Sequence, residues 1–141
     1  MPMTALPDHV RAFLAGRHFL ALATLDADGA PRQSVIWYTL DGQEIVVNSA
    51  VGRRWPANLV RDGRVSLAVT DRDDGYRWVG LTGTAVAATD QPSAQADIAA
   101  MARHYHSDDP AEAEALIRDR FTKQVRISFR IAISSHYDHL A

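Results

Sequence analysis

Four Asp-Gly pairs divide this sequence of 141 residues into short apolar segments, and this division constrains the fold more than any other feature. Asp-Gly is a preferred dipeptide of tight turns, and the segments beside it are rich in the β-branched and apolar residues typical of strands. We therefore expect antiparallel strands joined by short turns, the first three as a meander. The expected strands cover residues 18–24, 31–38, 44–48, 64–70, 76–88 and 123–134.

The last of these segments has the clearest pattern. Its apolar residues alternate with Arg126, Ser128 and Arg130, which predicts one apolar face and one polar face. Apolar spacing and capping residues predict helices over residues 6–15, between 52 and 63, and over 90–106 and 110–120, the last two capped by Thr89 or Asp90 and by Ser107 or Asp108. Six antiparallel strands with few helices predict a single mainly β domain over residues 1–141, as a small closed barrel rather than a sandwich.

Composition excludes several classes of function. The chain has no cysteine, which excludes disulfides and thiolate metal sites. A formal charge of −2 argues against general nucleic-acid binding. No segment has the pattern of a signal peptide or a membrane span, so we expect a cytoplasmic protein without membrane contact.

The histidines do not predict a metal site. His104 and His106 lie two residues apart on an expected helix, where two side chains do not face one point. No carboxylate spacing completes a metal site either, so we expect no bound metal. No residue is identified as a catalytic acid, base or nucleophile.

The stretch between the third and fourth expected strands is typical of an anion site. A loop of small residues leads into a short helix with Pro56 in its first turn. Such a loop directs backbone N–H groups toward one point, and Arg53 and Arg54 add two planar cations there. The alternative interpretation is that both arginines are solvated charges on a simple connection.

An ordered set of short motifs resembles the pyridoxamine 5'-phosphate oxidase-like split-barrel superfamily. Within it, the chain is most similar to actinobacterial oxidoreductases that use the deazaflavin coenzyme F420. The motifs are residues 20–38, 48–49, 53–54, 58–59, 61–66 and 73–78. The resemblance covers residues 7–137 and implies a six-stranded split β-barrel, a homodimer, and a flavin or deazaflavin bound between the two protomers.

The resemblance also implies which residues bind the cofactor. The family pattern Arg-x-Lys-x-x-Asn for the phosphate corresponds to Arg53, Trp55 and Asn58, with tryptophan at the lysine position and Arg54 expected to replace the lysine. Residues expected near the ring are Gln33, Ser34, Val35, Asn48, Ser49 and Ala50, with Trp78 from the partner chain. The alternative for Gln33 and Ser34 is an outward polar face. We further expect Trp78 and the strand over residues 125–133 to be buried at a two-fold interface.

The function that the resemblance implies is reduction of a small organic substrate by hydride from reduced coenzyme F420. Two alternatives stay open. One is an FMN-dependent oxidoreductase on the same barrel, because both cofactors have a phosphate and a tricyclic ring. The other is a protein without catalytic activity that carries a flavin or deazaflavin.

Overall fold

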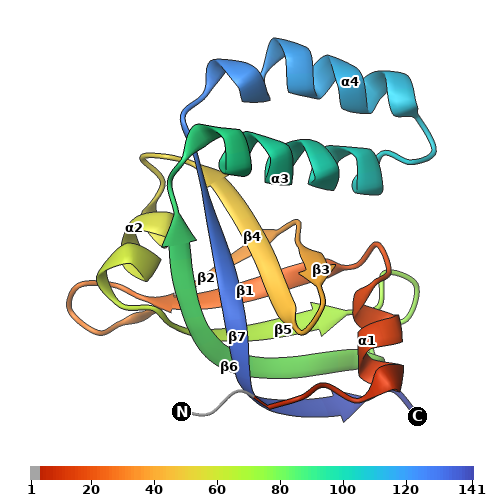
Figure 1. Cartoon of the computed structure of the whole chain (residues 1–141). Coiled ribbons are helices and arrows are strands. Elements are labelled where there is room, and N and C mark those ends of the chain that lie inside the picture. Colours follow the sequence, from red (N-terminus) through yellow and green to blue (C-terminus); the bar gives the residue numbers. More distant parts are fainter. Residues whose placement is uncertain (1–3) are drawn as a thin grey trace.

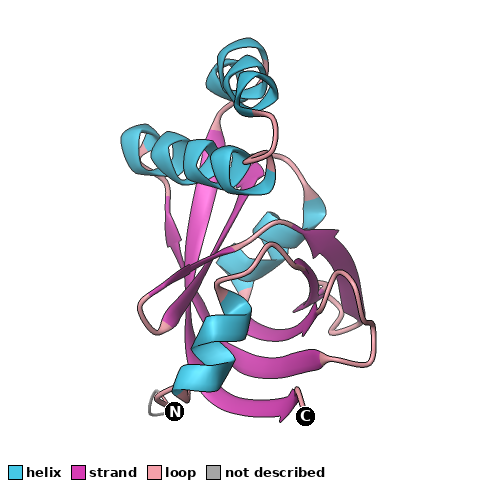
Figure 2. Cartoon of the chain, turned by 90° about the vertical axis from the view of Figure 1, so that its right-hand side faces the viewer, coloured by secondary structure: helices cyan, strands magenta, loops and turns pink. Residues whose placement is uncertain are grey.

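Residues 4–141, the part of the chain that the computed structural model describes, form one curved antiparallel sheet with two long helices stacked at one end (Figures 1 and 2). Within these residues the sheet has seven strands in the order β2-β1-β5-β6-β7-β4-β3. The strands are β1 (Phe19–Leu25), β2 (Pro31–Ile36), β3 (Thr39–Asp41), β4 (Glu44–Ala50), β5 (Arg64–Thr70), β6 (Trp78–Ala88) and β7 (Arg126–His139). The helices are α1 (Asp8–Leu14), α2 (Arg54–Arg61), α3 (Gln91–Tyr105), α4 (Pro110–Asp119) and the short 3-10 helix η1 (Phe121–Lys123). Residues 1–3 of the predicted domain lie outside the described residues.

The mainly β, split-barrel class is confirmed, but the strand count and the closure differ from the prediction. The extra strand is the three-residue β3, which pairs with β4. In the described chain β2 and β3 are the two ends of the sheet order and do not pair, so the sheet is not closed. The expected meander is also wrong, because β4 pairs with β3 and β7 rather than with β2.

The departure from the meander has a local cause. The chain leaves β2 at Trp37, and the next residue, Tyr38, is buried with its hydroxyl donating a 2.8 Å hydrogen bond to the carbonyl of Leu14. This anchor ends the strand and leads the chain to the opposite end of the sheet, where β3 begins. The two predicted hairpins, β1–β2 and β5–β6, are confirmed, and Gly29 in the first turn has the positive φ of 87° that favours glycine.

The core lies inside the curve of the sheet. Alternate side chains of β1, β5 and β6 point into it, which is the period-two burial expected of a strand with one buried face. Helix α2 adds Trp55 and Leu59 to this core, and the indole of Trp55 lies 5.9 Å from the ring of Phe129. Helix α2 is therefore held by packing as well as by its loop.

Helices α3 and α4 form a layer outside the barrel (Figure 1). Helix α3 packs on β4 and β7, and α4 packs on α3, around a second apolar cluster that includes Val46, Ile98 and Phe121. The layer covers the side of β7 that carries the polar residues of the alternating pattern, so Arg126 and Ser128 are only 3% and 1% exposed. The alternating pattern therefore does not mark a solvent-exposed face at these two residues.

Aspartate side chains cap the N-termini of α3 and α4. The side chain of Asp90 accepts a hydrogen bond from the N–H of Ser93, which confirms one predicted cap, whereas α4 is capped by Asp109 instead of Ser107 or Asp108.

Most of the strand expected at a two-fold interface, residues 126–133, is already covered within the chain by the barrel core and α3. None of the described helices is both long and apolar enough to cross a membrane.

One glycine is required by close packing between strands. The pairing of β6 with β7 shifts register between Thr82 and Gly83. A side-chain carbon on Gly83 would collide with the backbone carbonyl of Ala132 in β7. The irregularity at this point therefore depends on a residue without a Cβ atom.

Candidate functional site

A pocket of about 350 Å³ lies between the barrel and the helical layer. One side is built by the barrel strands and α2, and the other by α3, η1 and the residues beside it. The lining residues are Phe19, Val35, Ile36, Trp37, Asn48, Arg53, Trp55, Ile98, Met101, Arg120, Phe121 and Arg126. Three arginines thus meet a wall of aromatic and aliphatic side chains, a combination that suits a flat ligand with an anionic group.

Arg126 is the fixed cation of this pocket. Its Nε donates to Oδ1 of Asn48 at 3.0 Å and its Nη1 donates to Oε1 of Gln124 at 2.6 Å. The guanidinium also lies 5.0 Å from the ring centre of Phe121. Burial, together with the charges of Arg53 and Arg120, lowers the pKa of Arg126 to about 10, so the group is still protonated at neutral pH.

The aromatic wall is held rigidly. The rings of Trp37 and Tyr105 stack with centres 5.0 Å apart and planes only 6° apart, and Phe19 lies on Tyr105 at 6.0 Å. The hydroxyl of Tyr105 donates to the carbonyl of His18 and accepts from the N–H of Tyr38. This wall is therefore preformed by contacts on the side away from the pocket.

The pocket brings together four of the predicted cofactor residues: Val35, Asn48, Arg53 and Trp55. They come from β2, β4 and the loop and first turn of α2. Val35 is 72% exposed, whereas Trp55 is 6% exposed and mostly belongs to the core. At the position where the family has lysine, the side chain is thus turned inward and offers little to an anion.

Gln33 and Ser34, the other predicted cofactor residues of β2, lie on opposite faces of the sheet. Gln33 pairs with Ala23 and lies on the outer face of the sheet, where it lines a small hollow with Ala21 and Ser66. Ser34 pairs with the buried Leu22, so it points to the inner face. Because side chains alternate along a strand, Ser34 lies on the opposite face from Gln33 and Val35. Gln33 thus has the outward orientation of the alternative interpretation.

The residues at the end of β4 are largely committed to internal hydrogen bonds. Nδ2 of Asn48 donates to the carbonyl of Ala94 at 2.9 Å and to Oγ of Ser128 at 2.7 Å, while its Oδ1 accepts from Arg126. Ser49 is fully buried and donates to the carbonyl of Ala50, which is itself half-buried. Asn48 thus reaches the pocket chiefly by holding Arg126 in place.

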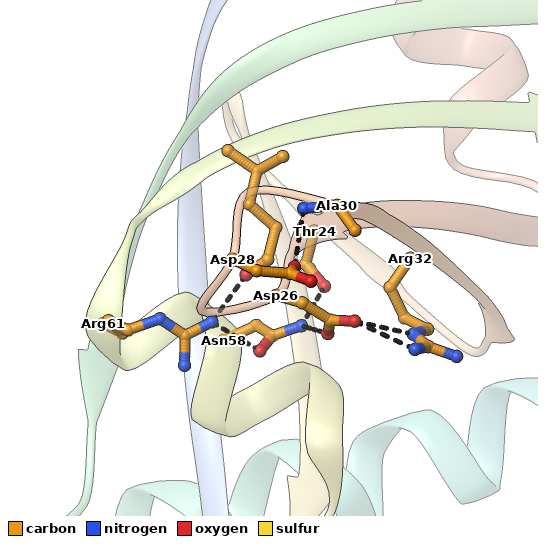
Figure 3. A network of polar contacts seen from close by, with 8 residues as sticks. Thr24, Asp26, Asp28, Ala30, Arg32, Asn58 and Arg61 are labelled. Carbon is orange, nitrogen blue, oxygen red and sulfur yellow. Dashed lines mark hydrogen bonds and ion pairs between the residues drawn. The ribbon is translucent and has the colours of Figure 1, made fainter.

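Asn58 joins α2 to the first hairpin (Figure 3). Its Nδ2 donates to Oγ1 of Thr24 at 3.0 Å and to Oδ1 of Asp26 at 2.9 Å. Arg61, one turn further along α2, donates to Oδ1 of Asn58 at 2.7 Å. Hydrogen bonds from Arg32 and Asn58 hold the pKa of the Asp26 carboxyl below its usual value, so this network is ionic at neutral pH. The network fixes the position of α2 and hence of the loop before it.

Arg54 and Trp78 lie outside the pocket. Arg54 is exposed in the first turn of α2, and its charge acts on Asp26 rather than on the pocket. Trp78 starts β6, where its ring lies 5.5 Å from that of Tyr137. Its expected contact with a cofactor depends on a second copy of the chain and stays a prediction.

Sequence reasoning missed Arg120, Arg126 and the apolar residues of the helical side. Arg126 was predicted only as part of a polar strand face, because strand alternation alone does not show that a helix covers that face. A signal was present in the neighbouring strand, where Ile45, Val46 and Val47 are apolar without alternation, as in strands buried on both faces. Within residues 4–141 no group of three or more His, Asp or Glu side chains is placed to hold a metal ion.

The family described as pyridoxamine 5'-phosphate oxidase matches residues 6–128. An F420H(2)-dependent biliverdin reductase of Mycobacterium tuberculosis (strain CDC 1551 / Oshkosh) is 36% identical over 89 residues, which are 62% of this chain and 63% of that protein. The match therefore spans less than two thirds of this relative.

Solved structures share the fold across most of the chain. A structure described as an F420 reductase has a TM-score of 0.73 at 19% identity, over 94% of this chain and 98% of that one. A conserved hypothetical protein from Mycobacterium tuberculosis has a TM-score of 0.77 at 23% identity, over 97% of this chain and 87% of that one. At these identities the likeness establishes the fold alone.

Proposed function

This chain belongs to the pyridoxamine 5'-phosphate oxidase family, and from this premise we propose that it is an oxidoreductase that uses coenzyme F420 to reduce a small organic substrate. The relative that is 36% identical carries the name of an F420-dependent reductase, which supports the deazaflavin. The observation that carries the proposal is the meeting of Arg53, Val35 and the aromatic wall in one pocket. This arrangement offers a cation for a phosphate and an apolar surface for a ring.

The residues of the chain have binding and positioning roles in this proposal. Arg53 holds the phosphate from the loop before α2, Val35 forms an apolar floor for the ring, and Asn58 fixes the helix that carries the loop. When bound, the reduced deazaflavin supplies the hydride. Ile98 and Met101 add apolar surface on the helical side of the pocket, against which a ring can pack.

An FMN-dependent oxidoreductase is the second candidate, because the family that matches the chain is described as pyridoxamine 5'-phosphate oxidase and FMN has the same two recognisable parts. A carrier of a flavin or deazaflavin without catalytic activity is the third. The three differ in measurable ways. An FMN-dependent enzyme is expected to bind FMN more tightly than coenzyme F420. A carrier is expected to bind its cofactor tightly without turnover of a substrate.

The protein is further proposed to act as a homodimer. The large exposed apolar side chains Val35 and Tyr137 support this, as does a hollow of about 450 Å³ over β1, β5 and β6 lined largely by small and apolar residues. A second copy on this face would cover that surface and bring Trp78 toward a shared groove. Light scattering tests the assembly, and a stable monomer at micromolar concentration would contradict the shared groove.

The experiment that tests the function is a parallel titration with coenzyme F420 and FMN, followed by tryptophan fluorescence. Trp37 and Trp55 line the pocket, so quenching is expected for either ligand that binds there. We expect F420 to bind with a dissociation constant of about 1 μM or lower and FMN to bind more weakly. Arg11→Ala, which removes a cation on α1 outside the pocket, is the matched control for variants that remove an arginine of the pocket.

A turnover assay follows the titration. Biliverdin is the first substrate to test with reduced F420, because the similar reductase carries that name. Oxidation of the reduced coenzyme that depends on substrate supports the proposal. Binding of neither cofactor would contradict it.

A further inference from the structure

Arg126 is a buried cation without an anionic partner in the described part of the chain. It is 3% exposed, and no Asp or Glu among residues 4–141 forms an ion pair with it. Two neutral acceptors, Asn48 and Gln124, bind its Nε and Nη1. Burial of a charge is unfavourable unless the charge is paired, so this arrangement is one that an added anion would stabilise.

The remaining nitrogen of Arg126 is neither bonded within the described chain nor fully buried. Nη2 has no hydrogen-bond partner among residues 4–141. No fully buried side-chain nitrogen or oxygen in the described chain lacks a partner, so Nη2 retains access to the pocket that Arg126 lines. The guanidinium is fixed on three sides, by Asn48, Gln124 and the ring of Phe121, and open on the fourth.

Two more cations lie at the same pocket. Arg53 enters from the loop before α2 and Arg120 from the end of α4, and both are close enough to Arg126 to act on its charge. No carboxylate lines the pocket in the part of the chain that the structure describes. In a chain with a formal charge of −2, this is a local concentration of positive charge.

We propose that the pocket is an oxyanion-binding site in which Arg126 is the fixed, preorganised ligand and Arg53 and Arg120 are the mobile ones. The ligand group is a phosphate or a carboxylate, because both match the planar donors of a guanidinium. Asn48 and Gln124 are positioning residues, since they orient Arg126 without facing the anion. The inference deepens the proposed function and rests on it only for the molecule that carries the anion.

The sharpest test is Gln124→Glu. This change keeps the shape of the side chain and places a carboxylate where Oε1 now accepts from Nη1 at 2.6 Å. An internal carboxylate would neutralise Arg126, so binding of inorganic phosphate, measured by isothermal titration calorimetry, is expected to weaken by about tenfold. If Arg126 had only a structural role, phosphate binding would be unchanged in Gln124→Glu.

Two further variants support the test. Arg126→Met removes the cation and is expected to abolish phosphate binding, with circular dichroism as the check on folding. Arg120→Ala changes an exposed side chain, so its expected weakening of phosphate binding does not depend on the core. The matched control is Arg130→Met, on the same strand but paired with Asp41, which is expected to bind phosphate like the wild type.

Paired ligands identify the source of the anion. If the anion is a phosphate, the preference for FMN over riboflavin is lost in Gln124→Glu. If it is a carboxylate, that preference is unchanged and the preference for biliverdin over its dimethyl ester is lost instead. Equal phosphate binding in the wild type, Gln124→Glu and Arg126→Met, or no saturable binding in the wild type, overturns the site.

The test separates this inference from the proposed function. Phosphate binding that falls in Gln124→Glu supports the site even when coenzyme F420 does not bind, and then only the proposed function fails. If phosphate binding is the same in the wild type, Gln124→Glu and Arg126→Met while F420 still binds and turns over, the site is overturned and the proposed function remains.

Discussion

The side-chain amide of Asn58 lies 2.9 Å from Oδ1 of Asp26, and this contact joins helix α2 to the turn of the first hairpin. Asn58 is 3% exposed and also donates to Thr24, so one amide group holds two strand-end residues. Because Arg53 immediately precedes α2, the contact also fixes the position of a cation at the pocket. Stability and ligand binding are therefore expected to depend on the same residue.

We expect Asn58→Ala to lower the free energy of unfolding by about 2 kcal/mol, because buried Thr24 loses a hydrogen-bond donor and Asp26 loses one of its donors. Urea unfolding followed by circular dichroism measures the change. The same variant should bind coenzyme F420 more weakly. Gln33→Ala, at an exposed position, is the control, and equal midpoints for the two variants would show that the amide does not hold α2.

The two neighbouring arginines should differ in their effect on binding. Arg53 lines the pocket and Arg54 does not, so Arg53→Ala is expected to weaken F420 binding more than Arg54→Ala. The double variant should lose more than about tenfold in affinity. Fluorescence titration measures the three dissociation constants. An unchanged dissociation constant in the double variant would show that this loop does not bind the phosphate.

Two glycines give a matched pair for packing. Gly83→Ala should destabilise the protein by about 2 kcal/mol, because the added carbon meets the backbone carbonyl of Ala132 and the strands must move apart. Gly75→Ala is the control, since a Cβ atom there meets nothing within 4 Å. Thermal unfolding of both variants compares them. Equal melting temperatures would mean that β6 and β7 can separate at the irregularity without cost.

The partly buried phenol of Tyr105 should make stability fall at alkaline pH. Burial raises its pKa to about 12, so above pH 10 the folded state holds a proton that the unfolded state releases. The contribution of this group is complete below pH 10 and is lost as the pH rises from 10 to 12. Tyr105→Phe should therefore show a shallower fall in the urea midpoint over this range. Tyr76→Phe, at an exposed side chain, is the control, and parallel curves for both variants would exclude the effect.

Local patterns predicted the parts of the fold that form locally. The β1–β2 and β5–β6 hairpins follow from turn residues between apolar segments, and α2 was predicted from Pro56 and the glycines near its ends. The partners of β4 were not predictable in this way, because its pairing with β7 joins residues about eighty positions apart. The break after β2 depends on the contact of Tyr38 with Leu14, which has no signature in the sequence.

The residues of the candidate site show the same difference between local and long-range structure. The loop with Arg53 was predictable because strand, loop and helix are consecutive. Arg126 was not, since its burial results from α3 covering β7, and a strand pattern shows only that two faces differ. The sequence shows Trp55 at the family's lysine position, but its place in the core beside Phe129 depends on how α2 packs.

The helical side of the pocket comes almost entirely from one continuous segment. Ile98, Met101, Arg120 and Phe121 all lie between the end of β6 and the start of β7, whereas Val35, Asn48 and Arg53 belong to the barrel and its loops. The barrel and this segment therefore contribute two different sides of the pocket. Replacement of residues 91–123 as a block would alter the shape and charge that a ligand meets while the hairpins and the loop before α2 stay unchanged. A chimaera with this segment from a relative is thus a direct route to exchanging ligand preference between members of the family.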